Sequence, residues 1–135
     1  MTIAVDFDGT IVEDAYPGIG KPRRFAIESL QELMKDGHQL ILWTYRYGDR
    51  LQEAVEFCRK YGVEFYAVNA SYPQEEFDGE AMSRKIHADI FVDDRMIGGF
   101  PGWGEIVQRI REGKYQKEFQ YKLEQSRKRR GLFRR

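Results

Sequence analysis

The stretch TIAVDFDGT, residues 2–10, decides the fold of this chain. Residues 2–7 predict a short buried β-strand, because they are mostly apolar and the run ends at Asp8 and Gly9. Asp6 and Asp8 are two positions apart, so their carboxylates point to the same side of the extended chain. The stretch therefore predicts a concentrated negative charge where a buried strand meets its loop, and Gly9 allows a sharp turn directly after it.

Apolar patterns downstream of this strand alternate between strand and helix. Apolar residues at helical spacing predict two helices, each followed by a glycine as a C-terminal stop, and short apolar runs predict further strands. In chain order the expected elements are strand 2–7, helix 23–36, strand 40–43, helix 49–61, strand 63–68, strand 88–92 and a helix near 104–112. Residues 69–82 are polar and irregular. The tail from about residue 115 is expected to be helical and then to become an Arg-rich coil.

This alternation predicts an α/β fold with a parallel sheet of at least four strands. Right-handed crossovers place helices on both faces of such a sheet, which gives a Rossmann-like three-layer sandwich. Ligands of open parallel sheets bind at the carboxyl ends of the strands. Polar residues follow three of the expected strands at that edge, and we expect these side chains to gather there: Asp6, Asp8, Thr44, Asp93 and Asp94.

Length and composition indicate one soluble globular domain. The chain has 135 residues, of which 41% are hydrophobic and 33% charged. No apolar run approaches the ~20 residues of a membrane span, and the N-terminus lacks the basic start of a signal peptide. The single cysteine, Cys58, excludes an internal disulfide framework and a cysteine-based zinc cluster. We therefore expect a cytoplasmic protein without a membrane partner.

Charge divides the chain into an acidic body, residues 1–113, and a basic tail, residues 114–135. The tail holds nine Lys or Arg residues against two acidic ones, a net charge of +7, and the body carries −7. Three interpretations of the tail stay open. It is a solvated end, it docks on the acidic body of its own or a neighbouring subunit, or it attracts nucleic acid. We favour the first two.

Carboxylates that lie close together at a sheet edge are unfavourable unless a cation neutralises them or one of them holds a proton. Mg²⁺ is the natural partner for such a site, since it is a hard divalent ion that prefers oxygen ligands. Asp93 and Asp94 supply further carboxylate oxygens from the end of another strand. The Thr44 hydroxyl can donate to a phosphate oxygen, and Lys85 can balance carboxylates and phosphate oxygens as a point charge.

The order of these residues resembles the four motifs of the haloacid dehalogenase (HAD) superfamily. In order, the motifs are DFDGT at 6–10, LILWT at 40–44, Lys85 and FVDD at 91–94. Asp-x-Asp alone is a weak signal, but four motifs in the right order on the right elements are specific, and they extend over about two-thirds of the chain. VDDR at 92–95 also resembles the last motif of the polynucleotide 3′-phosphatase branch. The resemblance implies a HAD-like fold and a Mg²⁺-dependent phosphate monoester hydrolase.

The resemblance also implies catalytic roles. Asp6 is the expected nucleophile, which forms an aspartyl-phosphate. Asp8 is the expected general acid for the leaving group and then the general base for water. An acid at position 8 favours phosphatases and phosphomutases within the superfamily. Thr44 and Lys85 are expected to hold the oxygens of the transferring phosphoryl group.

The expected metal ligands are the Asp6 carboxylate, the Asp8 backbone carbonyl, and Asp93 or Asp94. Of the last two we favour Asp94, by resemblance to the polynucleotide branch. Arg46 and Arg95 either grip a substrate phosphate or balance local acids. The residues expected to contact substrate are Gly9, Thr10, Tyr45, Arg46 and Arg95.

The spacing between motifs leaves no room for the separate cap domain that is common in the superfamily. An open site suits a large phosphorylated substrate or one that a neighbouring subunit covers, and it is compatible with a homo-oligomer. Alternatively, residues 11–22 and 69–82 act as small lids. Two other functions stay open, a nucleic-acid or nucleotide 3′-phosphatase and a catalytically silent module that binds phosphorylated ligands or a protein. Taken singly, each polar residue is also explained as the cap of a strand end.

Overall fold

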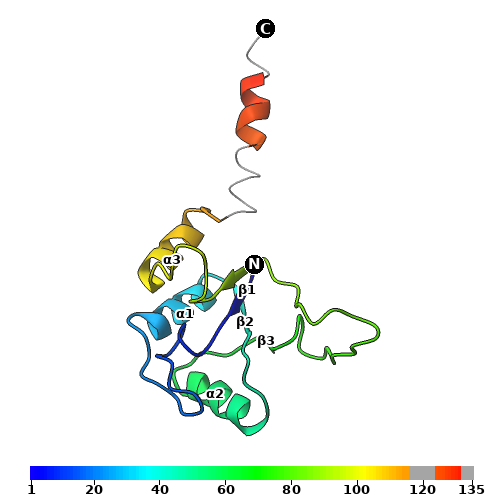
Figure 1. Cartoon of the computed structure of the whole chain (residues 1–135). Helices are drawn as coiled ribbons and strands as arrows, with labels where there is room; N and C mark the ends of the chain where they lie inside the picture. Colours follow the sequence, from blue (N-terminus) through cyan, green and yellow to red (C-terminus); the bar gives the residue numbers. More distant parts are fainter. Residues whose placement is uncertain (116–123, 132–135) are drawn as a thin grey trace.

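The computed structural model of the chain describes residues 1–115 and 124–131 (Figure 1). The elements follow the predicted order, with strands and helices alternating. They are β1 (Thr2–Val5), α1 (Ala26–Lys35), β2 (Gln39–Leu42), α2 (Gly48–Lys60), β3 (Ala67–Val68), β4 (Ile90–Val92) and α3 (Trp103–Arg111). No helix in the described part of the chain combines the length and apolar character needed to cross a bilayer.

The four strands form one open sheet in the order β3-β2-β1-β4. Every pairing is parallel, and Val5 of β1 stands between Leu42 of β2 and Val92 of β4. The predicted α/β fold with a parallel sheet is therefore confirmed. Since all strands run the same way, their carboxyl ends lie along one edge, and β1 reaches that edge at the centre.

Helices α1, α2 and α3 pack on one face of the sheet. The main core joins Ile3 and Val5 of β1 to residues such as Leu30 of α1, Cys58 of α2 and Ile106 of α3. Alternate strand residues point to the opposite face. There Ala4, Ile41 and Ala67 pack with Ala70 and Ile86 in a second, smaller cluster.

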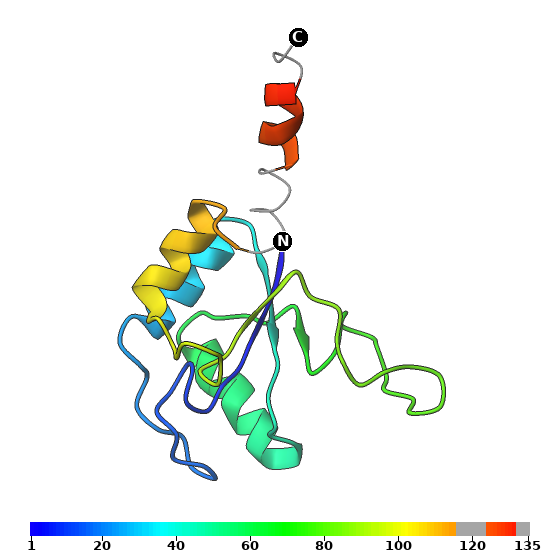
Figure 2. The same cartoon turned by 45° about the horizontal axis from the view of Figure 1, so that its top comes forward.

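Helices were expected on both faces, but the segment that covers the second face contains no α-helix. Residues 69–89 connect β3 to β4, extend away from the helices and return (Figures 1 and 2). Pro73 and Gly79 interrupt this segment, and few of its apolar residues stand at helical spacing. The three layers are thus helices, sheet and an irregular connection, and no separate cap domain stands between the described strands.

Four predicted elements are shorter in the structure. Three of them are β1 (Thr2–Val5), α1 (Ala26–Lys35) and β4 (Ile90–Val92). The strand expected at 63–68 is shortened to Ala67–Val68, because Val63 ends α2 by donating from its backbone nitrogen to the Cys58 oxygen (3.0 Å). Residues 124–131 are helical, and the tail was expected to begin as a helix. Lys, Arg, Gln and Glu all favour helices, which explains why the Arg-rich residues 127–130 continue it. The rest of the predicted tail structure, at 116–123 and 132–135, lies outside the described residues.

Candidate functional site

Three carboxylates meet at the carboxyl edge of the sheet. Asp6 directly follows β1, and Asp93 and Asp94 directly follow β4. The backbone nitrogen of Asp6 donates to the Val92 oxygen at 3.0 Å, which continues the ladder between the two strands past their ends. One carboxylate oxygen from each aspartate lies within 4.8 Å of the other two. The expectation that Asp6, Asp93 and Asp94 gather at one edge is met.

Thr10 fixes the orientation of two carboxylates of this cluster through its hydroxyl group. Its buried hydroxyl lies 2.9 Å from an Asp6 oxygen and 3.1 Å from an Asp94 oxygen, so its single proton is donated to one of them at a time. The same hydroxyl accepts from the backbone nitrogen of Asp94 at 2.9 Å. The buried Trp103 indole in turn donates to the Thr10 carbonyl oxygen at 2.8 Å. Thr10 was predicted to contact substrate, and here it supports the carboxylates.

Gly9 allows the carboxylates to approach the backbone. Its φ is +85°, a region that L side chains rarely adopt, and a Cβ at this position would lie 2.6 Å from an Asp94 carboxylate oxygen. Arg23 donates to the Gly9 carbonyl oxygen at 3.0 Å and holds the turn. A side chain at position 9 would therefore displace Asp94.

Within residues 1–115 and 124–131, no lysine or arginine forms an ion pair with the three carboxylates of the cluster. Burial, followed by repulsion from the Asp93 carboxylate, raises the pKa of Asp6 from 3.8 to about 7, although the hydrogen bond from Thr10 opposes the change. A hard cation bound between Asp6, Asp93 and Asp94 would offset the repulsion among their carboxylates, because hard cations prefer carboxylate oxygens as ligands. The residues present therefore fit a divalent ion of the Mg²⁺ type, with Asp6, Asp93 and Asp94 as its side-chain ligands.

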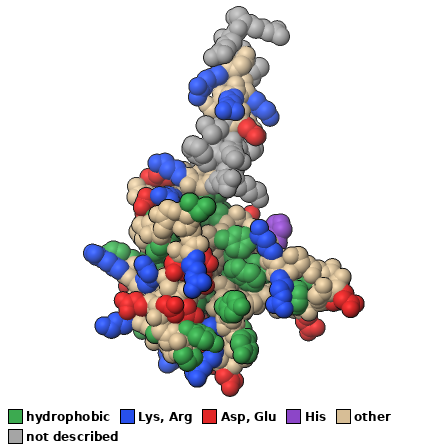
Figure 3. Space-filling view, viewed as in Figure 1, with side chains coloured by type: hydrophobic (Ala, Val, Ile, Leu, Met, Phe, Trp, Pro, Cys, Tyr) green, Lys and Arg blue, Asp and Glu red, His purple; other side chains and the backbone are tan. Residues whose placement is uncertain are grey.

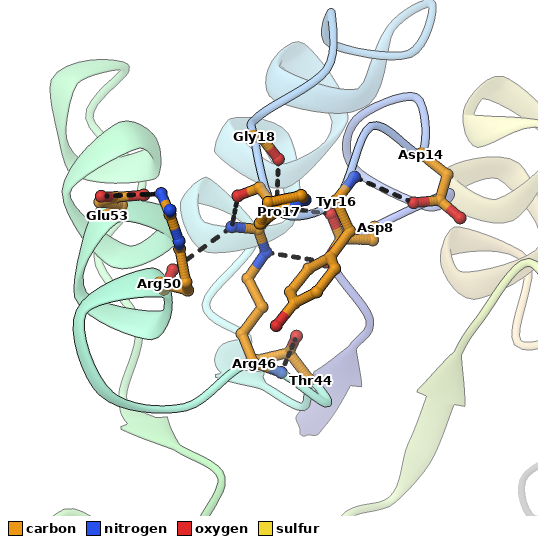
Figure 4. A network of polar contacts seen from close by, with 9 residues as sticks. All are labelled: Asp8, Asp14, Tyr16, Pro17, Gly18, Thr44, Arg46, Arg50 and Glu53. Atoms are coloured by element: carbon orange, nitrogen blue, oxygen red, sulfur yellow. Dashed lines mark hydrogen bonds and ion pairs between the residues drawn. The ribbon is translucent and has the colours of Figure 1, made fainter.

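Asp8 is engaged elsewhere, in an ion pair with Arg46 (Figure 4). The Arg46 guanidinium donates to both Asp8 oxygens, at 2.8 and 2.7 Å. Its side chain is fully buried, whereas that of Asp8 is 18% exposed. Asp8 is thus not part of the carboxylate cluster among the described residues. The ligand expected from Asp8 was its backbone carbonyl, which this pairing leaves available.

Of the two roles that the sequence left open for Arg46, the structure shows the second. It balances a local acid, and its remaining hydrogen bonds go to backbone carbonyls, including those of Pro17 and Gly18 at 3.2 and 2.5 Å. The pairing with Asp8 raises the pKa of Arg46 above its ordinary value. In this arrangement the guanidinium is directed at the protein rather than at a substrate.

Thr44 follows β2 at the same edge and is held by a residue that sequence reasoning missed. The backbone nitrogen of Thr44 donates to the Asn69 side-chain oxygen at 2.8 Å, and the Asn69 amide donates to the Arg46 carbonyl at 3.4 Å. Asn69 follows β3 and has a φ of 50°, a left-handed conformation that asparagine tolerates. The sequence feature that could have identified Asn69 is its position directly after a predicted strand. Tyr45, next to Thr44, is fully exposed.

Lys85 and Arg95 stand apart from the carboxylates. Lys85 is exposed, and its ammonium lies 5.8 Å from the ring centre of Phe91. Within residues 1–115 and 124–131 it forms no ion pair with the cluster. Arg95 is exposed too, and only its backbone is tied to the site, by donating to an Asp93 oxygen at 2.8 Å. The structure therefore brings together three of the four motifs, and the role of Lys85 stays a prediction.

Comparison with known proteins identifies a similar solved structure. No family model matches the sequence, and no curated protein matches it. A solved structure of a conserved protein from Bacteroides thetaiotaomicron is 54% identical to this chain, with a TM-score of 0.79. The match covers 85% of this chain and 93% of that one. That protein is described only as conserved, so the similarity indicates neither an activity nor a ligand.

Proposed function

The chain belongs to the same family as the conserved Bacteroides thetaiotaomicron protein, and we propose that it is a Mg²⁺-dependent phosphate monoester hydrolase of the HAD type. The observation that carries this proposal is the cluster of Asp6, Asp93 and Asp94 at the carboxyl edge of a parallel sheet, with one oxygen of each within 4.8 Å of the others. Uncompensated carboxylates in this position suit a cation, and an ionised Asp6 beside a cation suits attack on an anionic phosphate.

The reaction proceeds in two displacements at phosphorus. In the first, an Asp6 carboxylate oxygen forms a bond to phosphorus, the bond from phosphorus to the ester oxygen breaks, and the departing alkoxide takes a proton. In the second, water attacks the aspartyl-phosphate, the bond to Asp6 breaks, and inorganic phosphate leaves. A metal ion held by Asp6, Asp93 and Asp94 would supply positive charge that shields the nucleophile from the substrate. Thr10 holds Asp6 in place throughout, through the 2.9 Å hydrogen bond.

Asp8 serves as the general acid and base of these two steps. It stands two residues from Asp6, and Arg46 fixes both of its oxygens. A carboxylate paired with the Arg46 guanidinium suits the removal of a proton from the attacking water. Before Asp8 can donate a proton to the leaving group it must take one up from solvent, so we propose that substrate binding releases one Asp8 oxygen from Arg46 for this uptake, while the other oxygen keeps its hydrogen bond to Arg46.

The remaining predicted residues complete the phosphate site. Thr44 donates its hydroxyl to a phosphoryl oxygen, and Lys85 contributes its ammonium once the connection 69–89 brings it closer. Arg95 extends from the loop after Asp94, where it can reach a bound phosphate. We place the protein in the cytoplasm, which supplies phosphorylated metabolites and free Mg²⁺.

Hydrolysis of an activated aryl phosphate tests the proposal. Turnover is measured with Mg²⁺ and after its removal by a chelator, in the wild type and in Asp6→Asn. Asp49→Asn is the matched control, because Asp49 is an exposed residue in the first turn of α2. We expect turnover that needs both Mg²⁺ and Asp6 and that survives in Asp49→Asn. Turnover that persists in Asp6→Asn, or folded protein that binds Mg²⁺ without turnover, would contradict it.

A nucleic-acid 3′-phosphatase is the second candidate, because the described helix at 124–131 carries four consecutive exposed basic residues, 127–130 (Figure 3). Contacts between such residues and nucleic acid weaken steeply with salt. Binding of a 3′-phosphorylated oligonucleotide that falls with salt in the full chain, and no longer does so after substitution of 127–130 by glutamine, would favour this candidate over a small-metabolite phosphatase.

A further inference from the structure

The loop from Glu13 to Lys21 is a narrow, closed structure in the segment between β1 and α1. Its two ends are joined by a hydrogen bond from the Glu13 nitrogen to the Lys21 oxygen at 2.7 Å. A second bridge joins Val12 to Pro22 just outside it. The two sides of the loop lie so close together that a Cβ at Gly20 would overlap the Glu13 carbonyl. The loop base is therefore set by the backbone.

Arg46 fastens the tip of this loop to the site. Its guanidinium donates to the carbonyl oxygens of Pro17 and Gly18 at 3.2 and 2.5 Å, and the same group holds both oxygens of Asp8 (Figure 4). A buried arginine with donors on both sides fixes the loop tip and Asp8 relative to each other. The residue just before these two carbonyls is Tyr16.

The Tyr16 ring lies over the Arg46 guanidinium, with 5.2 Å between the guanidinium carbon and the ring centre. Figure 4 shows the ring on the loop that Arg46 anchors. Tyr16 is nevertheless 54% exposed, so much of its ring is open to solvent. An aromatic ring held from behind loses little conformational entropy when a ligand stacks on it.

We propose that Tyr16 is a specificity-determining residue that stacks on the leaving group, and that the substrates are phosphate esters of flat aromatic alcohols. The inference rests on the proposed function, in which the ester oxygen departs next to Asp8. Arg46 ties Asp8 and the Tyr16 loop together, so a group attached to that oxygen extends past Asp8 to the open face of the ring. Flat aromatic groups use such a face better than small alkyl groups, because aromatic pairs gain from offset stacking as well as buried area.

Binding of two phosphonates that cannot be hydrolysed tests this directly. In benzylphosphonate and ethylphosphonate a methylene replaces the ester oxygen, and only the first carries an aromatic ring. Both are titrated into the full chain with Mg²⁺ by calorimetry. The variants are Tyr16→Ala and Tyr16→Phe, and the matched control is Tyr72→Ala, since Tyr72 is 49% exposed on the connection 69–89.

We expect the wild type to prefer benzylphosphonate, and Tyr16→Ala to reduce that preference about tenfold, the size of one lost ring contact. Tyr16→Phe keeps the preference, because it keeps the ring, and Tyr72→Ala keeps it as well. An unaltered preference in Tyr16→Ala, or equal weakening of both phosphonates, overturns the inference.

Turnover of 1-naphthyl phosphate in the same samples separates this inference from the proposed function. A Tyr16-dependent preference in a protein without turnover leaves the stacking role standing and removes the hydrolase. Turnover without any preference removes the stacking role and leaves the hydrolase. A wild type that binds neither phosphonate and turns over no ester removes both.

Discussion

Replacing Arg46 with methionine removes the guanidinium at the centre of the network in Figure 4 and keeps a side chain of similar length. Arg46 is 1% exposed. Its loss leaves the two Asp8 oxygens without their ionic partner and the carbonyls of Pro17 and Gly18 without a donor. Removing one member of a buried ion pair typically costs about 3–5 kcal/mol, because the other charge remains without compensation. Since the Asp8 side chain is 18% exposed, we expect a value near the lower end.

Urea unfolding of the wild type and Arg46→Met, followed by circular dichroism, measures this loss. For a chain of this size, a loss of about 3 kcal/mol lowers the melting temperature by roughly 10 °C. Arg50→Met is the matched control, since Arg50 pairs with Glu53 on the surface with both side chains about half exposed. Exposed pairs contribute at most about 1 kcal/mol.

Two further variants sharpen the test. Arg46→Lys is expected to recover little stability, because an ammonium group cannot donate to both Asp8 oxygens and the two carbonyls with one planar fork. In the Arg46→Met background, Asp8→Asn is expected to recover part of the loss, because it removes the charge left behind. A loss in Arg46→Met no larger than that in Arg50→Met would refute the buried ion pair.

Three other variants or conditions test the site and the core. Gly9→Ala is expected to destabilise the protein by about 1–3 kcal/mol, because the φ of Gly9 is +85° and the added Cβ would meet Asp94. The same variant is expected to weaken Mg²⁺ binding measured by calorimetry. The control is Gly104→Ala, which lies in a helix with open space around it and is expected to be neutral or stabilising. Burial raises the pKa of Asp6 from 3.8 to about 7, so between those pH values the folded metal-free chain holds a proton that the unfolded chain has lost. Its free energy of unfolding should therefore fall as pH rises through this window, relative to Asp6→Asn at each pH, and a parallel pH profile in the two proteins would contradict this. Burial also raises the pKa of the Cys58 thiol to about 12, so labelling by a disulfide reagent at pH 8 should require unfolding and should speed up in step with added urea.

The part of the fold that follows from local pattern was predictable. β1 and β4 are short apolar runs that end in aspartates, and parallel strands bring such ends to one edge whatever the loops do. This is why Asp6, Asp93 and Asp94 could be placed together from the sequence. The helix-free face was not predictable in the same way, because the right-handed crossover rule fixes the side on which the connection 69–89 lies and not its secondary structure.

The partners of individual side chains were harder to foresee. From the sequence, Arg46 could pair with a phosphate or with any nearby acid. Only the path of the loop 13–21 shows that its guanidinium donates to Asp8 and to two backbone carbonyls. Asn69 carries no motif, and its bond to the Thr44 backbone depends on a left-handed turn after β3. Lys85 lies on a long irregular connection, where spacing in the sequence does not determine position in space.

The central claim is that Asp6 becomes phosphorylated during turnover. The most direct test is to mix the full chain with Mg²⁺ and an aryl phosphate, quench it with acid within the first turnover, and determine by peptide mass spectrometry which residue carries a phosphoryl group. The proposed function predicts a phosphoryl group on the peptide that contains Asp6, absent without Mg²⁺ and absent in Asp6→Asn. Turnover with no phosphorylated peptide, or with the phosphoryl group on another residue, would contradict it.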